Sequence, residues 1–338
     1  MKKSLLALSL LSAFGIASAQ SSVTMYGIVD AGITYDNGSS AGTVTKLESG
    51  IESGSRLGFR GTEDLGSGLK ALFVLEQGFD IDTGKSGQGG RLFGRQAWVG
   101  LNSEYGQVSA GRQYTPIFNA YGVVDPFGKG TSGDIYTLFG RASDFLSEYK
   151  RMDNSVVYTT PSSLGGFNAA VAYSFGEVAG DEKKQAQAGL SLGYNNGPLS
   201  VVYAYHKANN ALAKPPASTE TYQAHLVGGT YDFKVVKLHV AAEQVKHGDN
   251  HKTESYLLGA TVPVGQHSLF ADYTYRNDKM NDDSNSDQFA IGYNHNLSKR
   301  TNLYTILAYT TNDPKAKINV DVYGKSYKSV QLGIRHAF

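Results

Sequence analysis

The side chains in this sequence that most often catalyse reactions or bind metals are scattered along the chain. It has eight histidines and no cysteine. His247 and His251 lie four residues apart, a spacing that on a helix would bring two imidazoles together as zinc ligands, but no helical periodicity surrounds them. The other histidines are His206, His225, His239, His267, His295 and His336. With no G-x-S-x-G, P-loop or paired-cysteine motif, the sequence predicts no metal site, no cofactor and no enzymatic chemistry.

Composition favours an all-β chain. Among 338 residues there are 40 glycines and 22 tyrosines but only 8 prolines, and 18% of the residues are charged. Such frequent glycine and aromatic residues are more typical of strands joined by turns than of a helical enzyme. The mean hydropathy of -0.29 excludes a bundle of membrane helices, because no run after the N-terminus reaches the 18 or so apolar residues that a spanning helix needs.

The first twenty residues, MKKSLLALSLLSAFGIASAQ, are typical of a secretory signal peptide. Lys2 and Lys3 precede an apolar stretch that is too short to span a bilayer, and small residues end the stretch at Ala19. We therefore predict a signal peptide over 1–19 and a mature domain over 20–338; a retained buried helix is the alternative. Removing the two lysines from 31 basic residues leaves 29 against 30 acidic ones, so the overall charge predicts no nucleic acid partner.

Apolar and polar residues alternate with a period of two along most of the chain, which predicts β-strands. In the segment 267–276, Leu269 and Tyr273 fall on one face. Asp272 and Thr274 fall on the other. The sixteen segments with this pattern are 21–36, 53–65, 68–82, 92–102, 106–116, 154–161, 166–176, 186–195, 198–207, 221–231, 235–245, 254–263, 267–276, 287–295, 301–311 and 328–338.

The connections between these segments are short and long in turn. The short ones, such as NNGP and PVGQ, contain residues that suit tight turns. An antiparallel meander with this alternation has two unlike ends, one with short turns and one with long loops. The longer polar stretches are 37–52, 82–91, 117–153, 177–185, 208–220, 246–253, 277–286 and 312–327.

The strands must lie in a closed sheet, because an open sheet of sixteen strands would leave two exposed edges. A closed sheet of this size is too wide for side chains to fill its interior. The polar faces then line a water-filled lumen, and the apolar, aromatic-rich faces contact lipid. The sequence therefore predicts an all-β, 16-stranded antiparallel transmembrane β-barrel. A soluble β-sandwich or β-helix is the alternative, since it shares the alternation.

Several long motifs, in order along the mature chain, resemble those of the trimeric general porins of Gram-negative outer membranes, in the branch typical of β-proteobacteria. The motifs are SSVTMYGIVD near the start, SRLGFRGTEDLGSGLKALFVLE at 55–76, GRQAWVGL at 94–101, GRQYTP at 111–116, DNSVVYTTPSSLGGFNAAVAY at 153–173, YNHNLSKRTNLY at 293–304 and GIRHAF at 333–338. The resemblance implies a channel for passive diffusion of ions and small hydrophilic solutes. It also implies a homotrimer in outer-membrane lipid and lipopolysaccharide.

The resemblance implies roles for particular residues. The third loop, 117–153, would fold into the barrel and constrict the pore, with Asp125 and Asp134 as acidic lining; solvated loop carboxylates are the alternative. A C-terminal aromatic is part of the family's signal to the barrel assembly machinery, which implies that role for Phe338. These residues are expectations carried over from the family.

Three arginines match the family's wall cluster opposite the third loop: Arg56, Arg95 and Arg151. They belong to the second, fourth and sixth strands or just precede them, and these strands run in the same direction in a meander. The guanidinium groups can therefore meet on one wall, where arginine keeps its charge. Glu76 is a further candidate for the lumen. This arrangement predicts a weak to moderate preference for anions.

Two other functions stay open at this stage. In a solute-specific channel, the loop aromatics Phe127, Tyr136 and Phe139 could form a track for sugars or aromatic solutes. An outer-membrane barrel enzyme is the less favoured alternative, because such barrels tend to be smaller. Persistent conductance in a planar bilayer would distinguish a channel from an enzyme.

Overall fold

The computed structural model describes residues 22–128, 130–141, 150–209 and 220–338 as a sheet of antiparallel strands; the predicted signal peptide lies outside the described residues. The strands are β1 Ser22–Ser39, β2 Gly42–Ser49, β3 Arg56–Gly66, β4 Leu69–Gly78, β5 Gln96–Ser103, β6 Gly106–Tyr114, β7 Arg151–Thr159, β8 Phe167–Ser174, β9 Gln187–Asn196, β10 Leu199–Ala208, β11 Tyr222–Asp232, β12 Lys237–His247, β13 His251–Val264, β14 His267–Asp278, β15 Ser286–Asn296, β16 Thr301–Asn312 and β17 Tyr327–Ala337.

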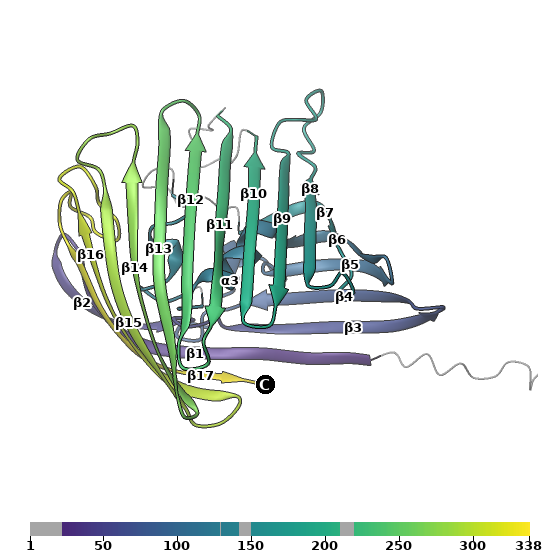
Figure 1. Ribbon diagram of the computed structural model, residues 1–338, viewed down its shortest axis with the longest axis horizontal. Helices are drawn as coiled ribbons and strands as arrows, with labels where there is room; N and C mark the ends of the chain where they lie inside the picture. Colours follow the sequence, from purple (N-terminus) through teal and green to yellow (C-terminus); the bar gives the residue numbers. More distant parts are fainter. Residues whose placement is uncertain (1–21, 129, 142–149, 210–219) are drawn as a thin grey trace, which may run out of the picture.

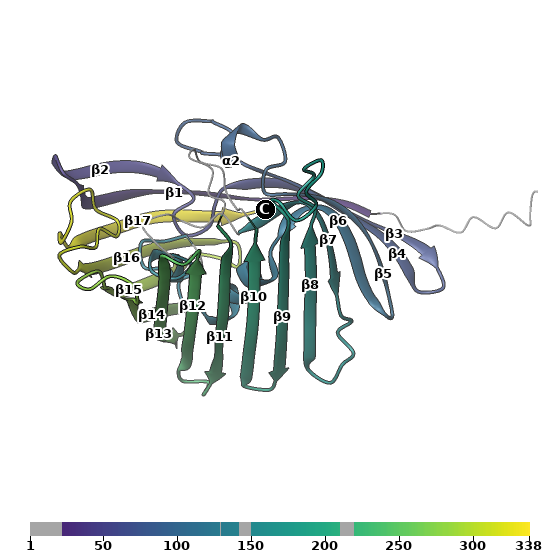
Figure 2. The ribbon, with the colours of Figure 1, turned by 90° about the horizontal axis from the view of Figure 1, so that it is seen from above.

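The sheet closes on itself because the last strand pairs with the first. From β3 onward each strand pairs with the next, and β17 pairs with β1 from Ile28↔Ala337 onward. Both β2 and β3 pair with β1, so they are two halves of one barrel strand that is interrupted at 50–55. The described residues thus form a closed barrel of sixteen antiparallel strands, as predicted (Figures 1 and 2).

Short and long connections alternate as the sequence predicts. Turns such as 104–105 and 197–198 join strands at one end, whereas 79–95 and 115–150 join them at the other. One predicted long loop, 37–52, is wrong, because β1 and β2 continue as a hairpin to Ser39 and Gly42. Its Thr-Val-Thr alternation pairs with β1, although glycine and serine surround it. The predicted loop 246–253 also shortens to three residues between β12 and β13.

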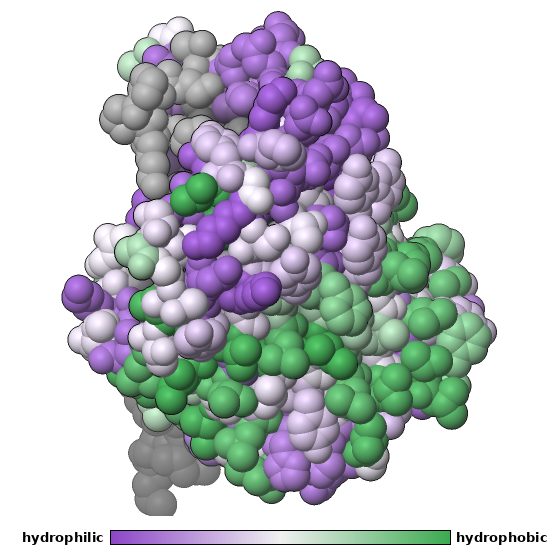
Figure 3. Space-filling view, turned by 90° about the vertical axis from the view of Figure 1, so that its left-hand side faces the viewer, coloured by the Kyte–Doolittle hydropathy of each residue, from purple (hydrophilic) through white to green (hydrophobic). Residues whose placement is uncertain are grey.

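The two faces of the sheet are inverted relative to a soluble protein. In β14, Tyr273 is 47% exposed, whereas Asp272 is 2% exposed. In β15, Phe289 is exposed and Gln288 is buried. The apolar row therefore faces outward and the polar row faces into the barrel, which is the arrangement of a barrel that contacts lipid. One outer face shows apolar side chains across its lower part and polar side chains above them (Figure 3).

The helical segments lie in the long connections. They are α2 Gly87–Gly90, α3 Pro116–Val124 and the 3-10 turn η1 Ile135–Thr137. Within the described ranges, no helix has the length and apolar character needed to cross a membrane. Strands, rather than helices, thus make up the wall, and the helices belong to its loops.

Candidate functional site

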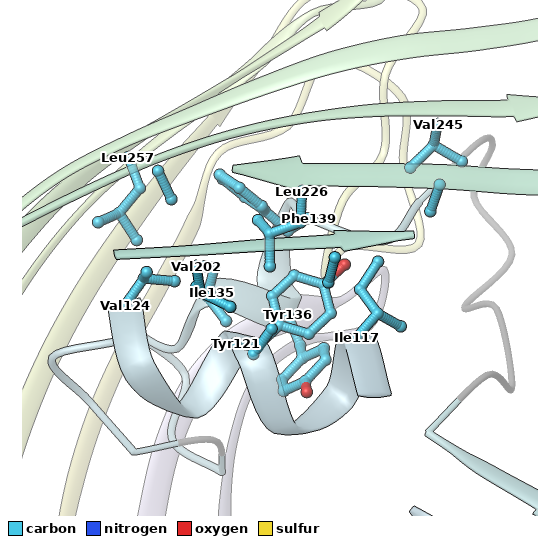
Figure 4. Packing of buried hydrophobic residues seen from close by; sticks show 14 of the residues in the cluster. Ile117, Tyr121, Val124, Ile135, Tyr136, Phe139, Val202, Leu226, Val245 and Leu257 are labelled. Atoms are coloured by element: carbon cyan, nitrogen blue, oxygen red, sulfur yellow. The ribbon is translucent and has the colours of Figure 1, made fainter. Parts of the chain in front are cut away.

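The described parts of the connection 115–150, residues 115–128 and 130–141, lie inside the barrel, where α3 packs against the inner faces of β9 to β12. The connection begins with α3, whose N-cap Thr115 accepts a hydrogen bond from Phe118 N at 3.1 Å and whose first residue is Pro116, both common at helix starts. Residues of α3 and η1 form a buried apolar cluster with residues of β10 to β13 (Figure 4). We call this connection the inner loop.

A single carboxylate holds both limbs of the inner loop. Glu243 on β12 is 3% exposed and accepts a hydrogen bond from the Tyr121 hydroxyl on α3. Its other oxygen accepts from Gly140 N at 2.5 Å, on the returning limb. Because a buried carboxylate needs donors, these two bonds satisfy Glu243 and fix the loop at once.

Other inward-facing polar side chains bind backbone groups of the inner loop. The ring of His239 contacts Val124 O at 3.1 Å, at the C-terminal end of α3. Gln331, on β17, accepts from Ser132 N at 2.9 Å. The remaining bonds are Thr253 Oγ1 to Arg141 O at 2.7 Å and Ser255 Oγ to Leu138 O at 3.3 Å. The loop is therefore attached to the wall at several separate points.

Arg95 and Glu76 form a buried ion pair on the opposite part of the wall. The Nε of Arg95 lies 2.8 Å from Glu76 Oε1, and both side chains are almost fully buried. The other oxygen, Oε2, accepts from the Tyr26 hydroxyl at 3.0 Å. Glu76 therefore cancels the charge of Arg95 locally, and its own negative charge is not available to the lumen.

Arg151 meets Arg95 through the side chain of Tyr114. The Tyr114 hydroxyl accepts from Arg95 Nη2 at 2.8 Å and from Arg151 Nη2 at 3.2 Å. The guanidinium of Arg151 also lies 4.7 Å from the centre of the Tyr114 ring. Its Nε donates to Arg95 O at 2.9 Å, so the two arginines are held in contact.

Arg56 completes the same cluster. Its Nε donates to Gly54 O and its Nη2 donates to Ser53 Oγ, both at 2.8 Å. A Cβ placed at Gly54 would lie 2.9 Å from Arg95 Nη1, so Arg95 and Arg56 reach the same short segment. The structure therefore brings together the predicted residues Arg56, Arg95, Arg151 and Glu76, which we call the arginine cluster. Their role in a pore stays a prediction.

The two predicted loop carboxylates face different cavities. Asp134 lines a cavity of about 890 Å³ with Lys150 and Arg141. Asp125 lines a smaller one of about 290 Å³, and its Oδ1 accepts from Phe127 N at 2.9 Å. Burial, and then the charge of Asp125, raise the pKa of Asp134 to about 7. Neither aspartate lies among the hydrogen-bonded members of the arginine cluster.

Sequence reasoning missed the inward segment 50–55. Ile51 is buried in one apolar cluster with Phe127 of the inner loop. The carboxylate of Glu52 accepts from Asn294 Nδ2 at 2.6 Å and from Asn302 Nδ2 at 2.8 Å. The glycines and serines of SGIESGS are the signal that could have indicated a break in the strand here.

The proposed track of loop aromatics does not form. Phe127 is 3% exposed and packs edge-to-face on Phe270, and Phe139 is fully buried. Tyr136 stacks on Phe118, and the amine of Lys150 lies 4.7 Å from its ring centre. These rings are occupied by packing because they hold the loop to the wall. Among the described residues, no three His, Cys, Asp or Glu side chains are grouped to hold a metal ion.

Known proteins resemble this chain over its whole length. A sequence profile described as Gram-negative porin matches residues 6–315. An outer membrane porin of Bordetella pertussis is 35% identical, and outer membrane porin protein 32 of Delftia acidovorans is 38% identical, each with 100% of both chains covered. The solved structure of an anion-selective porin from Comamonas acidovorans has a TM-score of 0.83 and 34% identity, covering 94% of this chain and 100% of that one.

These similarities agree with the barrel and with its inverted faces. They place the protein in the outer membrane of a Gram-negative bacterium, as a channel for passive diffusion of ions and small hydrophilic solutes. The chain belongs to the Gram-negative porin family.

Proposed function

We propose that the channel prefers anions and that the arginine cluster, facing the inner loop, is its constriction. The observation that supports this proposal is the pairing of charges. Glu76 neutralises Arg95, whereas Arg56 and Arg151 have no carboxylate within 4 Å among the described residues. Two positive charges are then left at the wall. The solved porin that resembles this chain is described as anion-selective, which supports the same sign.

The size of this effect is sufficient for selectivity. At about 7 Å and an effective dielectric constant between roughly 20 and 80, one charge changes the energy of a passing ion by about 0.6 to 2.4 kcal/mol. The screening length in physiological salt is about 8 Å, so charges on the outer loops act weakly at the constriction. Two uncompensated arginines therefore favour anions over cations by several-fold.

The test is the zero-current potential across a salt gradient in a planar bilayer. We expect Arg56→Gln and Arg151→Gln each to lower the anion-to-cation permeability ratio about two- to five-fold. Arg91→Gln is the matched control, because Arg91 is exposed in a loop and pairs with Asp153 at 2.7 Å. Unchanged ratios in both cluster variants would contradict the proposal.

Arg95→Ala is a second test of the proposed role of the arginine cluster. This substitution removes one positive charge and leaves Glu76 without its partner, at a position where the pair is 2.8 Å apart. The ratio should fall at least as far as in Arg151→Gln. If Arg95→Ala leaves the ratio unchanged, Arg95 does not lie at the constriction.

We also propose that three barrels assemble side by side, through the outer faces of the first strands. Val23 and Met25 on β1 and Val99 on β5 are 60 to 68% exposed. A patch of this kind suits contact between barrels. Cross-linking in mild detergent should give trimers; monomers alone would contradict this assembly. Lipopolysaccharide around the trimer follows from the outer-membrane location.

Export and insertion complete the proposal. The signal peptide would direct secretion, and Phe338 would present its ring to the barrel assembly machinery. In the folded barrel, Phe338 exchanges two backbone hydrogen bonds with Gly27, both 3.1 Å long, and its side chain is 42% exposed. Phe338→Ala should therefore lower the yield of folded barrel in the membrane more than it lowers the stability of the barrel once folded.

A further inference from the structure

We propose that Tyr114 is a positioning residue for ion selectivity: it holds Arg95 and Arg151 in one geometry and couples that geometry to the inner loop. This inference rests on the proposed role of the arginine cluster. Tyr114 is the last residue of β6, directly before the inner loop begins. It is therefore the residue where the wall and the loop meet.

The hydroxyl of Tyr114 uses its full hydrogen-bonding capacity. It accepts from Arg95 Nη2 and from Arg151 Nη2, and it donates to Glu76 Oε1 at 3.4 Å. A phenolic oxygen offers one donor and two acceptor sites. Through these three bonds, the neutral hydroxyl of Tyr114 connects the carboxylate of Glu76 with the guanidinium groups of Arg95 and Arg151.

Two guanidinium groups repel each other, so their contact needs a common partner. Arg95 has Glu76 as a counter-charge, but Arg151 has only neutral partners among the described residues. The shared oxygen keeps the charge of Arg151 beside the cluster. Without it, Arg151 keeps its charge but loses one of the bonds that fix its guanidinium group.

The ring of Tyr114 extends this support into the inner loop. The guanidinium of Arg151 lies 4.7 Å from the ring centre, and the ring of Phe118 of α3 stacks on Tyr114 with centroids 4.8 Å apart and planes 13° apart. Phe118 stacks in turn on Tyr136, whose ring has Lys150 4.7 Å from its centre. Three stacked rings thus connect Tyr114 with α3 and with the 3-10 turn η1, and the rings of Tyr114 and Tyr136 each contact a cation.

This arrangement predicts a selectivity effect without any change of charge. Tyr114→Phe keeps the ring and its stacking partners but removes the shared oxygen. If the guanidinium of Arg151 then moves away from the ion path by roughly 3 Å, the anion-to-cation permeability ratio falls about two- to three-fold. The hydroxyl of Tyr114 is itself uncharged, but it affects selectivity because it fixes the position of the charged Arg151 side chain.

A double-mutant cycle in planar bilayers tests the inference. The zero-current potential is measured for wild type, Tyr114→Phe, Arg151→Gln and the double variant. Tyr158→Phe is the control for the loss of a tyrosine hydroxyl, because the Tyr158 hydroxyl bonds to Tyr105 O at 2.8 Å at the exposed surface, away from the arginine cluster. As a single substitution, Tyr114→Phe should lower the anion-to-cation permeability ratio. In a protein that already carries Arg151→Gln, it should have no further effect.

Each result has a separate meaning. Additive effects in the double variant, or no effect of Tyr114→Phe beyond that of Tyr158→Phe, would overturn the positioning role. No effect of Arg151→Gln itself would instead overturn the proposed constriction. If Tyr114→Phe does not fold, Phe118→Leu replaces it, because it removes the ring that stacks on both Tyr114 and Tyr136 and leaves every charge in place. It should lower the ratio in the same direction, and only while Arg151 is present; no change with Arg151 present would also overturn the inference.

Discussion

The inner wall of the barrel carries the arginine cluster on β3 to β7, whereas on β10 to β13 it is covered by the inner loop. The wall of β3 to β7 presents Arg56 and Arg151 half-buried, and their hydrogen-bond partners among the described residues are neutral. The wall of β10 to β13 is covered by the inner loop and buries small and apolar residues such as Ala204 and Leu226. The inner face of β10 to β13 is therefore part of a protein core, whereas the arginine cluster is the part of the wall that we propose as a lining for solutes.

The difference supports the proposed constriction of a wide barrel. Sixteen strands enclose more space than their own side chains fill. The inner loop fills part of it by packing on one wall, and buried polar side chains such as Glu243 fix its limbs. Because the loop is fixed to one wall, we expect its distance from the arginines on the other wall to stay constant. Substitutions on the two walls should therefore change different measurable quantities.

The largest effect is expected on the covered wall. Glu243→Ala removes the acceptor for both the Tyr121 hydroxyl and Gly140 N, and each unsatisfied buried donor costs about 1 to 3 kcal/mol. The free energy that holds the loop to the wall should fall by roughly 2 to 6 kcal/mol. Faster proteolysis within the inner loop and larger current fluctuations in single channels would report this loss.

Glu254→Ala is the control for that prediction. Glu254 lies on the neighbouring strand β13, and within the described ranges it accepts only from side chains outside the inner loop, including Tyr256 at 3.2 Å. It should leave loop proteolysis unchanged. Equal proteolysis of both variants would show that Glu243 does not hold the loop.

A second pair of variants compares the two faces of the covered wall. Leu226 on β11 is fully buried against the inner loop, whereas Leu258 on β13 is 62% exposed on the outer face. Leu226→Ala should lower the free energy of unfolding by about 2 to 5 kcal/mol, because a cavity forms in a packed cluster. Leu258→Ala should cost less, and urea unfolding in lipid vesicles measures both. A larger loss for Leu258→Ala would mean that the cluster is not tightly packed.

The sequence predicted the strands of the covered wall closely, since the segments 198–207, 221–231, 235–245 and 254–263 match β10 to β13 within a few residues. In β14, alternation is clear because one face meets lipid and the other meets water or polar groups. In β10, Val202 and Ala204 face inward and Val201 faces outward, so both faces are apolar where the loop packs. The period of two is therefore weak in this strand, although the predicted segment 198–207 matches β10. Which strands the inner loop covers could not be predicted, because alternation describes a strand and not the segment that packs on it.

The arginine cluster was predictable in position but not in its partners. Because the strands that carry Arg56 and Arg95 run in the same direction, the two side chains could be placed in one region of the wall without knowing which residues they contact. Tyr114 could not be assigned, because strict alternation groups it with Val108, which is 49% exposed on the outer face. In the structure, the pairing of β6 with β7 shifts register just before the end of β6, and Tyr114 contacts Glu76. Such irregularities redirect a side chain, and alternation cannot reveal them.

The same substitution, Glu to Gln, should change ion selectivity more in the arginine cluster than on the covered wall. Glu76→Gln removes a negative charge from the arginine cluster and keeps an oxygen for Arg95, so the anion-to-cation ratio should rise about two-fold. Glu243→Gln removes a charge that the inner loop covers and should change the ratio less. Zero-current potentials compare the two. Equal shifts would mean that ions approach both walls and that the loop does not shield β12.

The smallest effect is a dependence of selectivity on pH, which arises from the inner loop itself. The pKa of Asp134 is about 7, because burial and the nearby Asp125 disfavour its ionised form more than Lys150 and Arg141 favour it. Between pH 6 and pH 8 its ionised fraction rises from roughly one tenth to nine tenths. The added negative charge should lower the anion-to-cation ratio as the pH rises.

Asp134→Asn isolates this titration from that of other groups. Burial lowers the pKa of Lys150, so its loss of charge at higher pH would act in the same direction. The part of the pH dependence that belongs to Asp134 should be absent from Asp134→Asn between pH 6 and pH 8, while any part due to Lys150 remains. Because Asp134 faces the larger cavity rather than the arginine cluster, its effect should be smaller than that of Glu76→Gln. If Asp134→Asn changed the ratio more than Glu76→Gln does, the narrowest part of the ion path would lie at Asp134 on the inner loop and not at the arginine cluster.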